Sequence, residues 1–410
     1  MAIRTGSSNI QTKHDYADIL IAIITGLMLV HVTLYLCIMP FVRTLAAGND
    51  FVVYWATGQQ LAHHSNPYDW NAMMRIEHSA GLAAGRQGGL MRNPPWGLIL
   101  AWPLGFAGLQ VGAVLWSLAQ LTSLMVSIHT LWRMHGSPRT SLIWLGVAFA
   151  PALLCLITGQ TSVFLLLGFV QFLRLHRSHP FRAGASLWLC TLKPHLFLPI
   201  GIVLLAWILV SKKYRLLAGA TVAMAASCLA VAFIDPAAWA EYARMMRNAG
   251  IESEHILCLS VALRLWLSPQ RLWLNYLPTA VGCTWALGYF WPRRHTWDWM
   301  RNGSPLMLTS LVTAPYAWIS DGSLAIPALL QGAYLTRSRM LLVVLASASV
   351  LIEIELFCGF KLDSPLYLWT APAWLGWYLL ATRIKRTEAK QNRITTLKIA
   401  ETPHRAMGSL

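Results

Sequence analysis

Apolar segments of roughly 15 to 25 residues recur along almost the whole chain, separated by short polar or basic stretches. An α-helix needs about 20 residues to cross a bilayer, and within lipid only helices and closed barrels satisfy their backbone hydrogen bonds. The pattern therefore predicts an all-α polytopic membrane protein with about 10–13 transmembrane helices. The expected spans lie near 17–41, 109–131, 142–158, 161–174, 183–193, 194–211, 214–234, 272–291, 303–319, 321–336, 339–358 and 365–382.

The first apolar segment, 17–41, is too long for the core of a signal peptide, and no small-residue cleavage site follows it. We interpret it as a retained first span. Residues 1–382 are expected to form one integral membrane domain. Residues 383–410 are basic and poor in large apolar side chains, which predicts a cytoplasmic tail that is disordered or lies along the inner leaflet.

Several expected spans are too short or too interrupted to cross a bilayer alone. The segment 161–174 is short, and Pro194 follows Lys193 between two apolar halves. Helix breaks at membrane depth survive only where protein or water covers the freed backbone groups, so these breaks indicate a cavity. Two long outer loops, 42–93 and 235–271, mix helix-forming stretches with Trp, Tyr and Met and predict short interfacial helices.

Charge supports a membrane protein with both termini in the cytoplasm. The chain is 56% hydrophobic and 12% charged, whereas soluble domains carry about 25% charged residues. Its net charge of +16 could indicate nucleic acid binding, but placing the bases as inner-face anchors of a plasma (inner) membrane protein explains it better. Most acidic residues then fall on the outer face, and no nucleic acid partner is expected.

Composition also limits the chemistry. The seven cysteines are scattered singly and without a CxxC motif, which is typical of buried free thiols. P-loop, GxGxxG, GxSxG and HExxH motifs are absent, so nucleotide-driven chemistry on a soluble domain is not expected. The run Glu252-Ser253-Glu254-His255 is interpreted as a solvated turn rather than a metal cluster, and no cofactor is predicted.

Asp50 stands where the first apolar segment meets the outer loop. A carboxylate at such a boundary can take a proton from an acceptor, bind a cation or cap the helix that begins at Phe51. Catalysis or substrate binding is the favoured hypothesis, and capping is the main alternative.

Other polar residues interrupt apolar segments on the same expected face. Lys193 could bind an anion or snorkel to head groups, and His195 could bind substrate or be a satisfied core histidine. Gln160 could bind substrate or bond a helix end. Arg244 and Arg247, three residues apart, fit a phosphate clamp or contact with anionic lipid equally well.

The late expected span 303–319 is closed by the run 315–321 near the outer surface, and Trp318 and Asp321 in this run are candidate site residues. The order of all these elements resembles glycosyltransferase family 87, a family of GT-C class membrane glycosyltransferases. The resemblance covers roughly residues 15 to 335. It rests on GNDFVVYW at 48–55, Asn66-Pro67-Tyr68, Asn93-Pro94-Pro95, Gly159-Gln160-Thr161-Ser162, Leu192-Lys193-Pro194 and Ala314-Pro315-Tyr316-Ala317-Trp318.

The resemblance implies a GT-C-like bundle and an inverting transfer of a hexose or pentose, mannose-like above all, in envelope biosynthesis. The donor would be a polyprenyl-phosphate sugar, the acceptor a lipid or glycan, and the site would face the outside. Asp50 would be the general base, Lys193 the first choice to stabilise the departing phosphate, with Arg244 or Arg247 behind it. Tyr54, Trp55 and Gln160 would hold or stack on the sugar.

One departure from the family pattern stands out. A late His-containing position is not matched, because Ile319-Ser320-Asp321 stands there. This departure leaves room for a protein whose catalytic site has decayed, and two hypotheses besides the glycosyltransferase remain open. One is a transporter or flippase for a lipid-linked or anionic solute, which the break at Lys193 suits. The other is a scaffold of an envelope-assembly complex.

Overall fold

The described part of the computed structural model comprises residues 7–86, 88–137, 140–248, 258–336, 338–359, 361 and 364–383. Within these ranges the chain forms helices and turns and no strand, as the apolar pattern predicts. The expected tail from 384 and the turn Glu252–His255 lie outside the described residues.

The α-helices are α1 (Ser7–Ile38), α2 (Arg43–Ala47), α3 (Phe51–Ala62), α4 (Trp70–Ala80), α5 (Leu98–Ala101), α6 (Leu109–Met134), α7 (Trp144–Val147), α8 (Ala150–Thr158), α9 (Ser162–Leu175), α10 (Pro180–Ser186), α11 (Leu198–Val210), α12 (Tyr214–Ile234), α13 (Ala238–Asn248), α14 (Leu259–Leu267), α15 (Leu277–Phe290), α16 (Trp299–Val312), α17 (Ile326–Leu335) and α18 (Arg339–Phe357). A further helix covers 370–383.

Short 3₁₀ helices join many of them: η1 (Met39–Phe41), η2 (Pro95–Gly97), η3 (Trp102–Phe106), η4 (Thr140–Ile143), η5 (Leu187–Leu192), η6 (Pro194–Phe197), η8 (Leu272–Tyr276), η9 (Trp291–Thr296), η10 (Ile319–Ala325) and η11 (Pro365–Tyr367). The predicted break at Lys193 is present, because η5 ends before it and η6 begins at Pro194. Proline explains the break, since it supplies no N–H to the preceding turn.

Among the described residues, three helices are long and apolar enough to cross a membrane: Ala22–Phe41, Leu109–Met134 and Tyr214–Ile234. Shorter apolar helices cover Pro95–Phe106, Ser162–Leu175 and Pro194–Val210. The chain is thus consistent with a helical membrane protein, while the larger number of spans stays a prediction. The expected span 142–158 is not one helix but η4, α7 and α8, and α8 starts anew at an extended Phe149 followed by Pro151 in its first turn.

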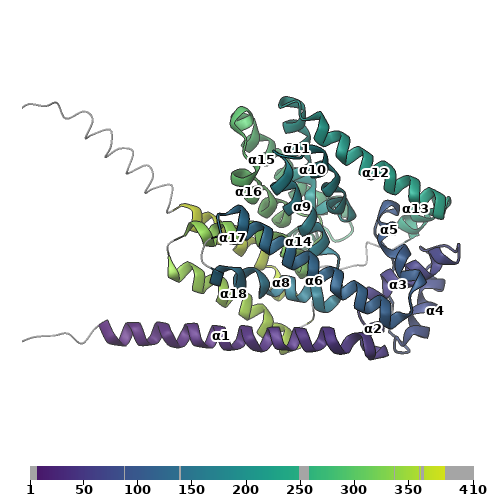
Figure 1. Cartoon of the computed structure of the whole chain (residues 1–410), viewed down its shortest axis with the longest axis horizontal. Helices are drawn as coiled ribbons and strands as arrows, with labels where there is room; N and C mark the ends of the chain where they lie inside the picture. The colour runs from purple at the N-terminus through teal and green to yellow at the C-terminus, as the bar shows by residue number, and fades with distance from the viewer. Residues whose placement is uncertain are drawn as a thin grey trace, which may run out of the picture.

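The helices divide into an elongated bundle and a group at one end of it. In Figure 1, α1 runs along one side of the molecule, where it contacts α8 and α18. Helices α2 to α5 gather with α13 at the C-terminal end of α1, on the right of that view. The first expected outer loop therefore contains α2, α3 and α4, and the second contains α13 and α14. Helices in both loops agree with the prediction, and their interfacial position stays a prediction.

Two hydrophobic clusters hold these parts together. The larger cluster joins the bundle around Phe169, Phe172 and Trp299, all of which are fully buried. The smaller cluster lies around α3 and includes Phe51 and Trp116. Each aromatic side chain that leaves water in such a cluster contributes a large apolar area, so the clusters are the main favourable contribution to packing. The candidate site lies at the start of α3, whose residues belong to the smaller cluster. The end of α8, whose residues belong to the larger cluster, lies beside it.

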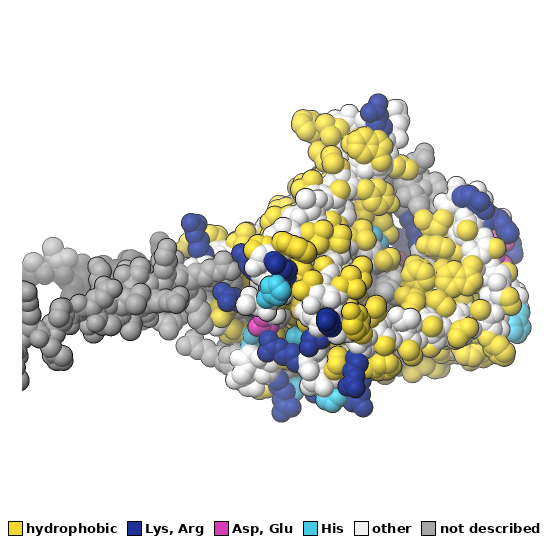
Figure 2. Space-filling model, turned by 90° about the horizontal axis from the view of Figure 1, so that it is seen from above, with side chains coloured by type: hydrophobic (Ala, Val, Ile, Leu, Met, Phe, Trp, Pro, Cys, Tyr) yellow, Lys and Arg dark blue, Asp and Glu magenta, His cyan; other side chains and the backbone are white. Residues whose placement is uncertain are grey.

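Large apolar side chains also cover much of the outside. Figure 2 shows hydrophobic side chains spread over the face in view, with Lys and Arg side chains confined to separate groups. On α12 the exposed side chains include Val222, Leu229 and Phe233, the last of which is 91% exposed. A soluble monomer seldom exposes continuous apolar surface of this kind, whereas a membrane protein presents it to lipid.

A glycine pair lets α3 approach η3 closely. A Cβ atom at Gly58 would lie 2.6 Å from the backbone nitrogen of Gly105, closer than real Cβ contacts. Two side chains of α3 add hydrogen bonds across the same contact: Trp55 Nε1 donates to the Ala107 carbonyl at 2.9 Å, and Gln59 Nε2 donates to the Gly105 carbonyl at 2.8 Å. The contact fixes the position of the helix that begins beside Asp50.

We expect Gly58→Ala to destabilise the protein by about 1–3 kcal/mol, because a methyl group there must push two backbones apart. Thermal unfolding of the purified protein in detergent measures the effect. The matched control is Gly201→Ala in α11, where the added methyl meets nothing within 4 Å. That control should unfold at the same or a higher temperature, since alanine favours a helix by up to about 1 kcal/mol over glycine. Equal melting temperatures for both variants would contradict the close approach.

Candidate functional site

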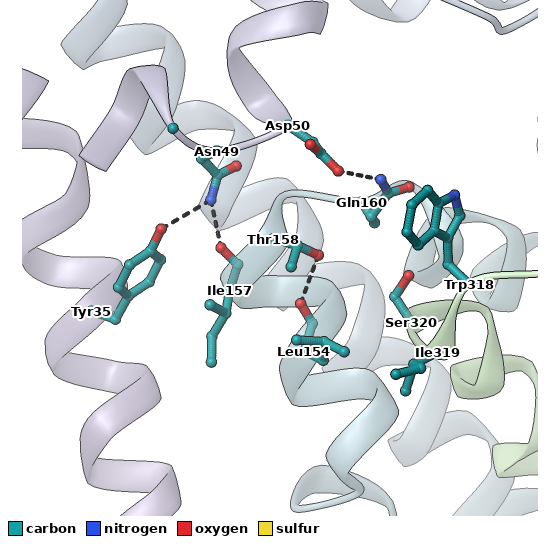
Figure 3. A pocket seen from close by; sticks show the side chains of 11 residues that line it. Tyr35, Asn49, Asp50, Leu154, Ile157, Thr158, Gln160, Trp318, Ile319 and Ser320 are labelled. Atoms are coloured by element: carbon teal, nitrogen blue, oxygen red, sulfur yellow. Dashed lines mark hydrogen bonds between the residues drawn. The ribbon is translucent and has the colours of Figure 1, made fainter. Parts of the chain in front are cut away.

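The site begins at the junction between α2 and α3. Asn49 is 4% exposed, and its Oδ1 accepts a hydrogen bond from the Phe51 N–H at 2.9 Å. Its Nδ2 donates to the Ile157 carbonyl at 2.5 Å and to the Tyr35 hydroxyl at 3.3 Å (Figure 3). Asn49 therefore caps the start of α3 and ties this start to α8 and α1.

Asp50 itself makes no capping bond with its side chain. Its backbone N–H donates to the Thr158 carbonyl at 3.0 Å, which fixes the main chain against the end of α8. The alternative that Asp50 caps α3 is thus wrong, and the neighbouring Asn49 does this instead. The carboxylate of Asp50 is left for other interactions.

A glycine turn brings Gln160 to Asp50. Gly159 follows α8 with φ +74, in the left-handed region that favours glycine, and a Cβ there would collide with Asn49 Oδ1. The Gly159 carbonyl accepts a hydrogen bond from Trp116 Nε1 at 2.9 Å, and the Gln160 carbonyl accepts one from Gln120 Nε2 at 2.6 Å. The two bonds from α6 hold the turn in place.

Four of the predicted residues form one polar chain. Gln160 Nε2 donates to Asp50 Oδ2, and Gln160 Oε1 accepts from Lys193 Nζ at 3.1 Å. Lys193 Nζ also lies 2.7 Å from Asp321 Oδ1, and these two side chains are 12% and 1% exposed. An ammonium only donates, so it faces the amide oxygen of Gln160 and directs the amide nitrogen at Asp50.

The carboxylate of Asp321 is fully engaged. Besides Lys193, the Ser162 hydroxyl donates to Oδ1 and the Trp318 N–H donates to Oδ2 at 2.9 Å. Buried charges persist when they are paired and hydrogen-bonded in this way. Asp321 therefore anchors Lys193, whereas Asp50 Oδ1 accepts no hydrogen bond from the described residues.

A cavity of about 330 Å³ lies beside Asp50, near the lower end of the range for small-molecule sites, which is about 300–1,000 Å³. Figure 3 shows that the side chains of Asp50 and Gln160 point toward one another at the edge of this cavity. Ser320 of η10 and Trp318, which directly precedes η10, lie on its other side. The lining residues come from four parts of the chain: Tyr35, Gly48, Asn49, Asp50, Leu154, Ile157, Thr158, Gln160, Trp318, Ile319 and Ser320.

The surroundings make Asp50 more basic. Asp50 opens to the cavity, but protein atoms around it remove much of its water, and this desolvation raises the pKa of the carboxyl above its ordinary value. The hydrogen bond from Gln160 and the charge of Lys193 oppose the shift without cancelling it. A raised pKa suits a carboxylate that must accept a proton.

His195 lies two residues beyond Lys193 in η6 and does not line the cavity. Its ring stacks on Tyr316, with centroids 3.8 Å apart and planes at 26°. Its Nε2 is buried without a hydrogen-bond partner. The stacking accounts for its position, and the unpartnered nitrogen keeps a substrate contact as a hypothesis.

Four other predicted residues are not brought to the cavity. Tyr54 is buried and stacks on Trp116, with centroids 4.5 Å apart, so it belongs to the smaller hydrophobic cluster. Trp55 donates to the Ala107 carbonyl on the η3 side of α3. Arg244 and Arg247 are exposed on α13. Sugar or phosphate contacts by these four residues stay predictions without support from the cavity lining.

Sequence reasoning missed the role of Asn49, although asparagine and aspartate are equally good helix N-caps and the two stand side by side. It also missed Tyr35 and Ser320 as cavity residues. No sequence motif marks them, and only the fold brings them to the cavity. Among the described residues, no group of three or more His, Cys, Asp or Glu side chains could hold a metal ion.

The caps lead to a prediction. We expect Asn49→Ala to lower the free energy of unfolding by about 0.5–2 kcal/mol, because α3 loses its cap. Asp50→Ala removes no capping bond and should cost less. Thermal unfolding of both purified variants in detergent makes the comparison, and a larger loss in Asp50→Ala would contradict the assignment of the cap to Asn49.

Comparison with known proteins gives one family. The model of glycosyltransferase family 87 matches residues 92–315, more than half of the chain. The match includes Gln160, Lys193 and His195, while Asp50 and Asp321 lie outside it. No curated protein and no solved structure gave a match. The match and the apolar helices indicate a membrane glycosyltransferase, and the chain belongs to glycosyltransferase family 87.

Proposed function

We propose that the protein moves a sugar from a polyprenyl-phosphate donor to a hydroxyl group of a lipid or glycan acceptor on the outer face of the membrane, with Asp50 as general base. The sugar would be a hexose or pentose, mannose-like above all. One observation carries the role of Asp50. Its carboxylate opens to a cavity with Oδ2 held by Gln160 and Oδ1 without a described donor.

The proposed reaction is a single displacement. The acceptor oxygen attacks the anomeric carbon and forms the new glycosidic bond, while its proton passes to Asp50 Oδ1. The bond between the anomeric carbon and the phosphate oxygen breaks, and the electron pair leaves with the polyprenyl phosphate. Attack opposite the leaving group inverts the anomeric centre. Phosphate is a good leaving group, so the base at the acceptor is the main requirement.

Lys193 acts on this reaction chiefly as a positioning residue. Its ammonium is already bonded to Gln160 and Asp321, which leaves little of it for a substrate phosphate. Through Gln160 it orients the amide that holds Asp50 Oδ2. Its positive charge also favours the carboxylate form of Asp50, so that the base is available to take a proton.

Trp318 would contribute on the opposite side of the cavity. Its backbone N–H is fixed by Asp321, and its side chain lines the cavity that Asp50 borders. An indole ring in this position can stack on a sugar ring while excluding water from the reacting atoms. The apolar Leu154, Ile157 and Ile319 complete a wall that suits the less polar face of a sugar or a lipid acceptor.

We expect Asp50→Asn to reduce transfer by about 10²–10⁴-fold, the usual contribution of a general base, while folding is kept. The assay follows radiolabelled sugar from polyprenyl-phosphate mannose into lipid extracts or glycan of membranes that contain the purified, reconstituted protein. The matched control is Glu77→Gln on α4, a carboxylate that accepts a hydrogen bond from the Gly89 N–H and does not line the cavity. Full activity of Asp50→Asn would remove Asp50 as the base.

The raised pKa of Asp50 leads to a pH prediction. The base works only when unprotonated, so kcat/KM should rise with pH through a limb placed above the ordinary pKa of aspartate. Gln160→Leu removes a hydrogen bond that lowers this pKa, so the limb should move to higher pH. Thr158→Val is the control, because Thr158 lines the cavity but donates to the Leu154 carbonyl. An unmoved limb in Gln160→Leu would contradict the coupling.

A further inference from the structure

Arg264 is a buried cation without a partner. It lies in α14 and is 1% exposed, and its Nε, Nη1 and Nη2 atoms have no hydrogen-bond partner among the described residues. It is the only Lys or Arg among the described residues whose side-chain nitrogens are all buried in this way. Isolated buried charges are strongly disfavoured, so a guanidinium retained in such a place indicates that an anion completes it.

Ser260 lies on the same face of α14, four residues before Arg264. Its hydroxyl is also buried without a partner. Side chains of a helix lean toward its N-terminus, so the guanidinium lies over the turn that carries Ser260. The N-terminal end of a helix also carries a partial positive charge. The hydroxyl of Ser260 lies in the first turn of α14, and Arg264, in the last turn, is on the same face.

The chemistry of the donors selects the kind of anion. A guanidinium offers a planar fork of N–H groups, and a hydroxyl adds one more donor. Together they fit an anion with several acceptor oxygens on one centre, as phosphate has. A phosphate has one more acceptor oxygen than a carboxylate, so it can take the guanidinium fork on two oxygens and the hydroxyl of Ser260 on a third.

The start of α14 contacts the chain segment that leads to the cavity. Helix α14 packs against η8, and Cys258 Sγ at its start contacts the carbonyl oxygens of Ala314 and Pro315 at 3.9 and 3.8 Å. The same segment continues to Trp318, which lines the cavity beside Asp50. An anion at α14 would thus be bound next to the segment that forms one wall of the candidate active site.

We propose that Arg264 and Ser260 form a phosphate-binding site. The phosphate is that of a polyprenyl phosphate or free inorganic phosphate, and only the lipid source rests on the proposed function. In the reaction proposed above, Lys193 is occupied by Asp321, so this site supplies the positive charge that the departing phosphate requires.

The test measures thermal unfolding and binding affinity of the full-length purified protein in detergent with polyprenyl phosphate, uncharged polyprenol or inorganic phosphate. The wild type should be stabilised by polyprenyl phosphate and not by polyprenol, and stabilisation by inorganic phosphate alone would assign the site to the free ion. Arg264→Met should lose at least about tenfold in affinity, as expected for a charge-assisted bidentate contact. Ser260→Ala should weaken binding less.

A structural role of Arg264 gives a different result. If the site is built for a ligand, Arg264→Met should unfold without ligand at the same or a higher temperature, because an unpaired buried charge is removed. A lower melting temperature without ligand, together with an unchanged phosphate response, would overturn the proposal, as would absence of any phosphate response in the wild type. Arg271→Met, at an exposed arginine before η8, is the matched control and should bind as the wild type does.

Asp50→Asn separates this proposal from the proposed function. That variant should bind polyprenyl phosphate as the wild type does although it no longer transfers sugar. If Asp50→Asn stays fully active, the base assignment fails while the binding result still decides the phosphate site. If Arg264→Met binds polyprenyl phosphate as tightly as the wild type, the phosphate site fails while the role of Asp50 is unaffected.

Discussion

The buried ion pair between Lys193 and Asp321 is the interaction on which the candidate site depends. It joins the break between η5 and η6 to the start of η10, two segments that are 128 residues apart in the chain. Removing a single partner would leave the other charge buried, so the pair constrains both segments at once. The remaining donor capacity of Lys193 fixes the amide of Gln160, and Gln160 in turn fixes one oxygen of Asp50.

Much of the local architecture follows from the sequence. Proline after Lys193, the short apolar segment before Arg174 and the polar residues between apolar segments predict the helix breaks that the structure contains. The sequence places Asp50, Gln160, Lys193, Trp318 and Asp321 on one expected face together with His195 and other polar residues, because ionisable groups next to apolar segments are costly unless they serve a function. The structure places these five side chains around one polar chain and one cavity.

What the sequence could not predict depends on contacts between distant segments. Tyr54 and Trp55 belong to the run GNDFVVYW that carries Asp50, but α3 packs against η3 and α6, and these contacts turn both side chains away from the cavity. Asn49 rather than Asp50 caps α3. The sequence could not predict this, because the two neighbouring residues are equally good N-caps and only the fold shows which side chain faces the helix. Arg264 stands in an apolar stretch that the sequence analysis did not single out, and only the structure shows that its guanidinium is buried without a partner among the described residues.

The position of the Asp50 carboxylate does not depend on the side chains that form the walls of its cavity, because Asn49 and Asp50 are joined to α8 through backbone carbonyl groups. The Ile157 carbonyl accepts from the Asn49 side chain and the Thr158 carbonyl accepts from the Asp50 backbone N–H, and neither bond depends on which side chains positions 157 and 158 carry. The walls contributed by Leu154, Ile157 and Ile319 can therefore change in size and shape while the base keeps its place. A lineage of such proteins could exchange one acceptor for another by substitutions in these walls, with the reacting centre inherited intact.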